Sequence, residues 1–179
     1  MSSPEMTNSE LVKILLDRLN LKHTVASPPG DEGDGVEVYS VAFNDTDFDS
    51  KWYLIIFTHR DQSILRFYSY IQGFEDDSNY VNVLKVLNFI NYEYILRGNL
   101  EYVTESNSVR FKSEFNYPAK GLPISETMER IKFEIARCGY MSILFRAIDF
   151  KSDDTASSVT AARGKVREDL GMEDDIDLG

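Results

Sequence analysis

The stretch FINYEYILRGNLEYVTESNSVRFKSEFNYP, residues 89–118, decides the fold class of this chain. It begins as the end of a helical pattern, passes through Gly98 and continues as two short runs separated by a polar turn at residues 105–108. In the second run, residues 109–117, apolar, aromatic or small side chains alternate with charged or polar ones. Such alternation predicts a strand with one buried face. The stretch therefore predicts a hairpin whose aromatic rings pack under one face of a sheet.

Three more strand-like runs precede this hairpin, at residues 36–43, 51–59 and 63–72. Their connections are short and rich in turn-forming residues, which favours an antiparallel meander. The middle run contains WYLIIFT, which is apolar at consecutive positions. A run of this kind is typical of a central strand that is covered on both faces or lies at a dimer contact.

Helical patterns flank the strands. Residues 7–10, TNSE, have the spacing of a capping box and open an amphipathic helix at about 8–21. A second helix is expected at about 78–96, with Gly98 just past its end, and a third at about 124–147. The predicted fold is therefore α+β, an antiparallel sheet with helices in the order α-β-β-β-α-β-β-α.

The chain is expected to hold one domain, because 179 residues suffice for a single core. All the predicted elements lie within residues 1–149. After Phe150 the sequence has no aromatic residue and many small or charged ones. Residues 150–179 are therefore expected to form an acidic, flexible tail, with a transient helix near residues 161–170. The end of this tail mixes aliphatic residues with acids, as either a partner-binding motif or an ordinary solvated terminus does.

The charge of the chain disfavours several partners. The net charge is -11, and such a surface repels phosphate backbones and anionic lipid, so neither nucleic acid nor a membrane is an expected partner. No segment approaches the roughly 20 apolar residues of a membrane span, and the polar, acidic start lacks the features of a secretion signal. A single cysteine, Cys138, allows no internal disulfide. These features together predict a soluble cytoplasmic protein.

One acidic segment resembles a calcium loop. NDTDFDS places Asp45, Asp47 and Asp49 at alternating positions, so their carboxylates could converge on a hard cation. A calcium loop of the EF-hand type needs Gly at its sixth position and Glu at its twelfth, where this chain has Ser50 and Ile56. An acidic hairpin turn is the favoured interpretation, and no metal site is predicted.

No catalytic or cofactor site is predicted either. His23 and His59 have no partner at the helical spacing of an HExxH zinc site. Cys138 has no nucleophile motif around it and is expected to be a small buried residue. The sequence contains no GxSxG, Walker or GxGxxG pattern, and no pair of carboxylates stands out among its many acids. The chain is therefore not expected to be an enzyme or to need a cofactor.

Aromatic residues of the predicted meander are the candidate partner-binding residues: Trp52, Phe67, Tyr68 and Tyr70. Alternation places Phe67 on one face of its strand and Tyr68 with Tyr70 on the other. If helices cover only one face, the other exposes rings, and large exposed apolar patches mark partner surfaces. The alternative is that both faces are covered and all of these rings belong to the core.

The segments VLKVLNFINYEYILRGNLEYVTESNSVRF and GLPISETMERIKFEIARCGYMSILFRAI resemble the YbjN family of bacterial sensory-transduction regulators, which shares a fold with type III secretion chaperones. The likeness spans about residues 10–148 and includes Asn88, Asn91 and Tyr92 of the second helix and the turn at Gly98. It implies an acidic, non-enzymatic α+β domain that is often homodimeric. The related chaperones hold segments of client proteins against apolar surface patches.

The leading hypothesis is a cytoplasmic protein-interaction module, regulatory or chaperone-like, that binds a protein partner through an apolar and aromatic surface and could form a homodimer. The second hypothesis is a small-ligand-binding protein or enzyme that uses carboxylates in a pocket beside the sheet. A deep, polar pocket holding an acid of strongly shifted pKa would favour it. A calcium-responsive module is the third hypothesis.

Overall fold

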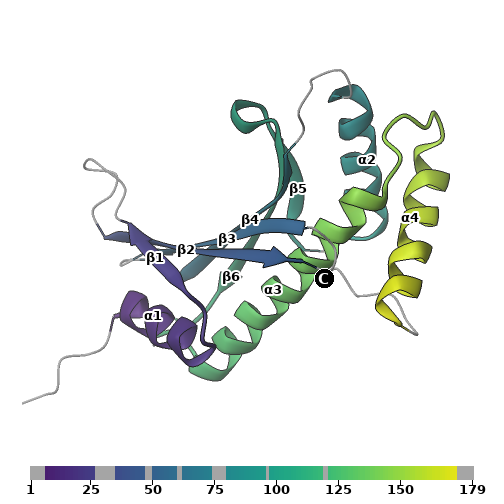
Figure 1. Cartoon of the computed structure of the whole chain (residues 1–179). Helices are drawn as coiled ribbons and strands as arrows, with labels where there is room; N and C mark the ends of the chain where they lie inside the picture. Colours follow the sequence, from purple (N-terminus) through teal and green to yellow (C-terminus); the bar gives the residue numbers. More distant parts are fainter. Residues whose placement is uncertain are drawn as a thin grey trace, which may run out of the picture.

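The computed structural model describes residues 7–26, 35–46, 50–59, 62–73, 80–95, 97–118 and 121–172. They form an α+β fold, as predicted, with a six-stranded sheet in the order β1-β2-β3-β4-β6-β5 (Figure 1). Every neighbouring pair of strands is antiparallel. The strands are β1 (His23–Ala26), β2 (Val36–Asp45), β3 (Ser50–His59), β4 (Ile64–Gly73), β5 (Asn99–Val103) and β6 (Ser108–Asn116).

Four α-helices accompany the sheet in the described part of the chain: α1 (Asn8–Arg18), α2 (Tyr80–Glu93), α3 (Ile124–Ala147) and α4 (Thr155–Leu170). A short 3-10 turn, η3 (Thr104–Ser106), joins β5 to β6. The first three helices and the last five strands lie where the sequence predicts them. The short strand β1 and the helix α4 are additions to the predicted order. None of these helices is long and apolar enough to cross a membrane.

Local signals at the element ends act as the sequence predicts. The Thr7 hydroxyl accepts a hydrogen bond from the Glu10 backbone N–H, and the Glu10 carboxylate accepts one from the Thr7 N–H, which completes the capping box of α1. After α2, Gly98 has a φ of 90°. A Cβ atom there would lie 2.4 Å from the carbonyl oxygen of Lys112 and 2.6 Å from the ring of Phe111. Glycine is therefore required at this turn for both conformation and space.

The helix α4 differs from the flexible tail that was expected after residue 150. It packs against α2 and α3, with Val159, Ala162 and Val166 buried. Asp154 caps its start by accepting a hydrogen bond from the Ser157 backbone N–H. The buried side chains of α4 are small, so the composition of this segment did not indicate a packed helix. Residues 173–179, the end of the expected tail, lie outside the described residues.

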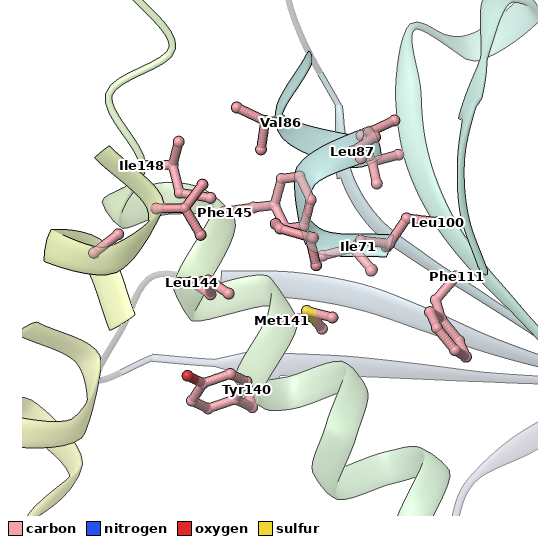
Figure 2. Close-up of a cluster of buried hydrophobic side chains, with 14 of the residues drawn as sticks. Ile71, Val86, Leu87, Leu100, Phe111, Tyr140, Met141, Leu144, Phe145 and Ile148 are labelled. Carbon is pink, nitrogen blue, oxygen red and sulfur yellow. The ribbon is translucent and has the colours of Figure 1, made fainter. Parts of the chain in front are cut away.

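Helices cover one face of the sheet, which we call the covered face. In Figure 1, α1 and α3 run along one side of the strands, while α2 and α4 stand beside the end of α3. The α1 cluster joins that helix to β2, β3, β4 and the first half of α3; its members include Val12, Leu15, Leu16, Tyr39, Leu54, Ile56, Phe67 and Ile131. The α2–α4 cluster fills the other end of the covered face (Figure 2), and includes Ile71, Val86, Leu87, Leu100, Phe111, Met141, Leu144 and Phe145.

The strand β6 confirms the prediction made from its alternation. Val109, Phe111 and Tyr117 are buried on the covered face. Arg110 and Lys112 lie between them and point to the opposite face. The rings of Phe111 and Tyr117 therefore belong to the core beneath the sheet, and the charged residues that alternate with them belong to a different surface.

Candidate functional site: the open face of the sheet

The candidate site is the sheet face opposite the helices, which we call the open face. Successive side chains of a strand point to opposite faces, so the neighbours of the buried Leu54, Ile56 and Phe67 point away from the helices. None of the described helices covers this face. Its members on the three central strands are Lys51, Tyr53, Ile55, Phe57 and His59 of β3, Ile64, Arg66, Tyr68 and Tyr70 of β4, and Arg110, Lys112 and Glu114 of β6.

Four aromatic rings occupy the middle of the open face. Tyr53 of β3 stands opposite Tyr70 of β4 in the register, and the side chain of Tyr53 is 49% exposed. One step along the sheet, the rings of Phe57 and Tyr68 meet edge to face with centroids 5.1 Å apart. Phe57, Tyr68 and Tyr70 are each partly buried by their neighbours on the face. The four rings thus share one face of the sheet across β3 and β4, and the strands hold them there.

Cationic side chains from β6 lie against these rings. The guanidinium carbon of Arg110 is 4.9 Å from the ring centroid of Tyr68 and 6.0 Å from that of Tyr70, whose hydroxyl accepts an Arg110 hydrogen bond of 3.3 Å. The ammonium of Lys112 is 5.9 Å from the Tyr68 centroid. A cation within about 6 Å of an aromatic centroid is attracted by the electrons of the ring. The aromatic and cationic residues therefore form one mixed surface.

The open face has the opposite charge to the chain as a whole. Among its described residues are four cationic side chains, Lys51, Arg66, Arg110 and Lys112, and two carboxylates, which give it a net charge of +2. The carboxylates belong to Glu101, 2.8 Å from Arg110, and to Glu114, which pairs with Arg66 at 3.0 Å. The whole chain carries -11.

Two titratable groups of this face are held in defined charge states at neutral pH. Burial raises the pKa of Glu101, but hydrogen bonds from Asn99 and Arg110 and the nearby Lys112 charge outweigh it and lower the pKa below its usual value. Burial, followed by the charge of Arg66, lowers the pKa of His59 below 6.5. Glu101 is therefore ionised and His59 neutral at pH 7, so the net charge of +2 holds there.

The structure separates the four candidate partner-binding residues into two pairs. Tyr68 and Tyr70 lie on the open face, as a partner surface requires. Trp52 and Phe67 lie on the covered face instead: Trp52 is 5% exposed and stacks on Phe43 at 3.9 Å, and Phe67 is fully buried. These two rings are core residues, which corrects their assignment to a binding surface. Alternation separates the two faces of a strand but does not say which face the helices cover.

Four residues of the open face were missed as candidates: Tyr53, Phe57, Arg110 and Lys112. The first two stand in WYLIIFT, where apolar residues at consecutive positions hide the alternation between the two faces. The two cations were correctly placed on the charged face of the last strand. The missing step was the strand order. β4 and β6 are neighbours in the sheet, although α2 and β5 lie between them in the sequence.

Asn91 of α2 closes one edge of the sheet. Its amide nitrogen donates to the Leu100 carbonyl oxygen at 3.0 Å, and its amide oxygen accepts from the Leu100 N–H at 2.7 Å. The side chain thereby occupies backbone groups of the edge strand β5 that would otherwise need another partner. Asn88 and Tyr92 are exposed on α2, and Tyr92 is 86% exposed.

A polar cluster lies beneath the sheet, away from solvent. The carboxylate of Glu134 on α3 is fully buried, accepts a hydrogen bond of 2.6 Å from the Ser113 hydroxyl and pairs with Arg130 at 2.7 Å and with Arg137. The Arg137 guanidinium also lies 3.7 Å from the centroid of Phe111. These interactions satisfy the buried carboxylate and fix α3 against β6, which is a structural role.

Cys138 is buried on α3, as the sequence predicts. Burial raises the pKa of its thiol to about 12. A thiol reacts as its thiolate, and a pKa this high leaves almost no thiolate at neutral pH. Cys138 is therefore a packing residue of the α1 cluster.

One pocket among the described residues bears on the hypothesis of a ligand site beside the sheet. A solvent-open pocket of about 400 Å³ lies between α1 and β1 and is lined by Asp17, Asn20, Leu21, Lys22 and His23. The His23 ring contacts the Leu21 carbonyl oxygen at 3.0 Å and lies 3.9 Å from the Asp17 carboxylate. That carboxylate is 60% exposed, unlike the desolvated acid of an acid–base site. The pocket therefore gives the hypothesis of carboxylate chemistry little support.

The calcium hypothesis depends on residues that lie outside the structural description. Asp47 and Asp49 are among the residues that the structure does not describe. Within the described ranges, no group of three or more His, Cys, Asp or Glu side chains could hold a metal ion.

Comparison of the chain with protein-family models, with curated proteins and with solved structures gives no match. Its function has therefore to be inferred from its own surfaces, of which the open face is the most distinctive.

Proposed function

We propose that the chain is a protein-interaction module, regulatory or chaperone-like, that binds a protein partner through the open face of its sheet. One observation carries this proposal: the described helices cover one face of the sheet, while the other carries a partly exposed patch of Tyr and Phe rings. Large apolar patches that remain at a surface mark sites of interaction.

The residue types of the open face also suit binding. Tyr and Arg are enriched among residues that dominate protein–protein affinity, because they provide large contact areas together with hydrogen-bonding groups. Arg110 joins both properties, since it pairs with Glu101 and lies against the rings of Tyr68 and Tyr70. These contacts hold the side chains in place before a partner arrives, which lowers the entropic cost of binding.

Affinity capture from the lysate of the native cell, read by mass spectrometry, tests the proposal. The wild-type chain is compared with Tyr53→Ser on the open face and with Tyr92→Ser on α2, which removes an equally large exposed ring from another surface. We expect the wild type and Tyr92→Ser to retain the same protein in stoichiometric amounts and Tyr53→Ser to lose it. Thermal unfolding of each variant verifies that it is folded.

Two outcomes would count against the proposed surface. Retention of the partner by Tyr53→Ser would show that the open face does not bind it. Loss of the partner by Tyr92→Ser alone would move the binding surface to α2. Light scattering of the three proteins determines whether a captured partner is a second copy of this chain.

A further inference from the structure

We infer that the open face binds an acidic segment of a partner protein, one in which carboxylates are interspersed with aliphatic side chains. This inference rests on the proposed function and adds the chemistry of the partner. It is carried by the reversal of charge on the open face and by the mixing of its cations with apolar rings.

Charge complementarity indicates the acidic character of the partner. The open face carries +2, and the chain as a whole carries -11, so the remaining residues carry -13. A basic partner segment would be drawn to those other surfaces and repelled at the open face. An acidic segment would find a favourable local charge at the open face, because exposed charges steer association over distances of about a Debye length.

Two lysines of the open face can accept a new carboxylate. The side chain of Lys51 is exposed, and no ion pair within the described ranges joins it to a carboxylate. Lys112 likewise has no carboxylate within salt-bridge distance among the described residues; its ammonium lies against the Tyr68 ring and is near enough to Glu101 to lower the pKa of that carboxyl. Arg66 and Arg110 already pair with acids of the face, so these arginines hold the surface together while the lysines remain open to a partner.

The rings beside these lysines require apolar groups in the same segment. Tyr53 is half exposed beside Ile55, and Phe57 and Tyr68 lie one step further along the sheet. A purely acidic segment would leave this apolar area in contact with water. Aliphatic side chains among the carboxylates would cover the rings and gain the free energy of apolar burial.

Single-stranded nucleic acid is the competing polyanion, since aromatic residues and cations on a sheet can also stack bases. The geometry favours a protein segment. Arg110 lies 4.9 Å from the centroid of Tyr68, against the ring that a base would need to stack on. In addition, each further nucleotide adds a phosphate charge to a complex with a chain whose other residues carry -13 in total, whereas a short protein segment can limit its carboxylates to the open face.

Fluorescence anisotropy with labelled probes of equal length tests the inference on the full chain. The probes are a peptide of Glu and Asp alternating with Leu and Ile, its analogue with Gln and Asn in place of the acids, its analogue with Ser in place of the aliphatic residues, and single-stranded oligothymidine. We expect the acidic–aliphatic peptide to bind about tenfold or more tightly than each of the other three. Equal binding of the amide peptide, or tighter binding of oligothymidine, would overturn the inference.

A pair of matched variants locates the binding site. Lys51→Gln/Lys112→Gln removes two cations from the open face, and Lys85→Gln/Lys132→Gln removes two exposed cations from α2 and α3 with the same change in net charge. We expect the first variant to bind the acidic–aliphatic peptide about three- to tenfold more weakly, and the second to bind it within about twofold of the wild type. Equal losses in both variants would show an effect of net charge alone and overturn the assignment.

The outcomes separate the inference from the proposed function. If the captured partner depends on Tyr53 while the peptides show no preference for acids, the open face is an interaction surface and the acidic preference is wrong. If capture and peptide binding are both unaffected by changes on the open face, both proposals fail. Self-association through Tyr53 that the acidic–aliphatic peptide does not displace would assign the face to a second copy and overturn the inference.

Discussion

The two faces of the sheet contain similar chemical groups and use them differently. Against the covered face, α3 holds the ion pair of Glu134 with Arg137, whose side chains are 0% and 1% exposed. The open face holds the ion pair of Arg110 with Glu101, at 29% and 28% exposure. Rings accompany both pairs, since Arg137 lies over Phe111 and Arg110 lies against Tyr68. Access to water decides whether such a group supports the fold or can meet a partner.

The largest difference in stability between the two faces is expected when one carboxylate is removed from each ion pair. Glu134→Ala would leave Arg130 and Arg137 without their shared buried partner and lower the free energy of unfolding by about 3–5 kcal/mol. Glu101→Ala would lower it by about 1 kcal/mol or less, because water can solvate the arginine that remains. Urea denaturation of both variants measures the two values. Losses of equal size would show that burial does not distinguish the pairs.

Phe67 and Tyr68, consecutive residues of β4 on opposite faces of the sheet, give a second comparison of the two faces. Phe67→Ala would create a cavity in the α1 cluster and cost about 3–5 kcal/mol, as truncation of buried aromatic residues does. Tyr68→Ala, one residue further along β4, would cost about 1 kcal/mol, because the ring is partly solvated and makes surface contacts with Phe57 and Arg110. Only Tyr68→Ala is expected to weaken partner capture. Thermal unfolding and the capture assay separate these effects, and a stable Phe67→Ala protein would contradict the burial of that ring.

The sequence predicts most of the fold because its decisive signals are local. The capping box at Thr7, the glycine turn at Gly98 and the alternation of residues 109–117 each depend on residues close together in the chain. The packing of α4 was not predicted, because Val159 and Ala162 bury little volume and gain their significance from α2 and α3. Tertiary contacts supply the information that composition lacks.

The candidate site was predicted only in part for the same reason. Tyr68 and Tyr70 were identified from alternation, and so was their separation from Phe67. The combined site also needs Arg110 and Lys112, about 40 residues away, and the pairing of β4 with β6 that brings them together. Strand order is a property of the whole chain. A single sequence therefore gives the residues of each strand face without showing which faces share one surface.

The edge strand β5, whose Leu100 backbone is bound by Asn91, gives a prediction with an intermediate effect on stability. Asn91→Ala removes both hydrogen bonds to the Leu100 backbone and should cost about 1–3 kcal/mol, the range for leaving partly buried polar groups unpaired. Asn88→Ala, on the exposed side of the same helix, should stay within about 0.5 kcal/mol of the wild type. Amide hydrogen exchange of Leu100 measures the local effect. Unchanged protection of Leu100 in Asn91→Ala would contradict the role of Asn91 at this edge.

The smallest expected effect on stability comes from the protonation of His59 on the open face. Its Nε2 atom lies 3.2 Å from Nη1 of Arg66, which can only donate, so the ring nitrogen accepts and the imidazole is neutral. Burial and then the charge of Arg66 lower the pKa of His59 in the folded chain, whereas the unfolded chain keeps a pKa near 6.5. As the pH falls below 6.5, the unfolded chain binds the proton first, and stability decreases until the pH passes the folded pKa.

Proton NMR of the imidazole rings measures this pKa directly, since the chain has only two histidines and a His23→Gln variant assigns their signals. Arg66→Gln should raise the pKa of His59 towards 6.5, because it removes a neighbouring positive charge. His59→Gln should flatten the fall in stability below pH 6.5. A pKa of His59 at or above 6.5 would mean that water and nearby acids govern the open face more strongly than its cations do. In that case His59 would add positive charge to the open face as the pH falls, and the net charge of +2 would hold only at higher pH.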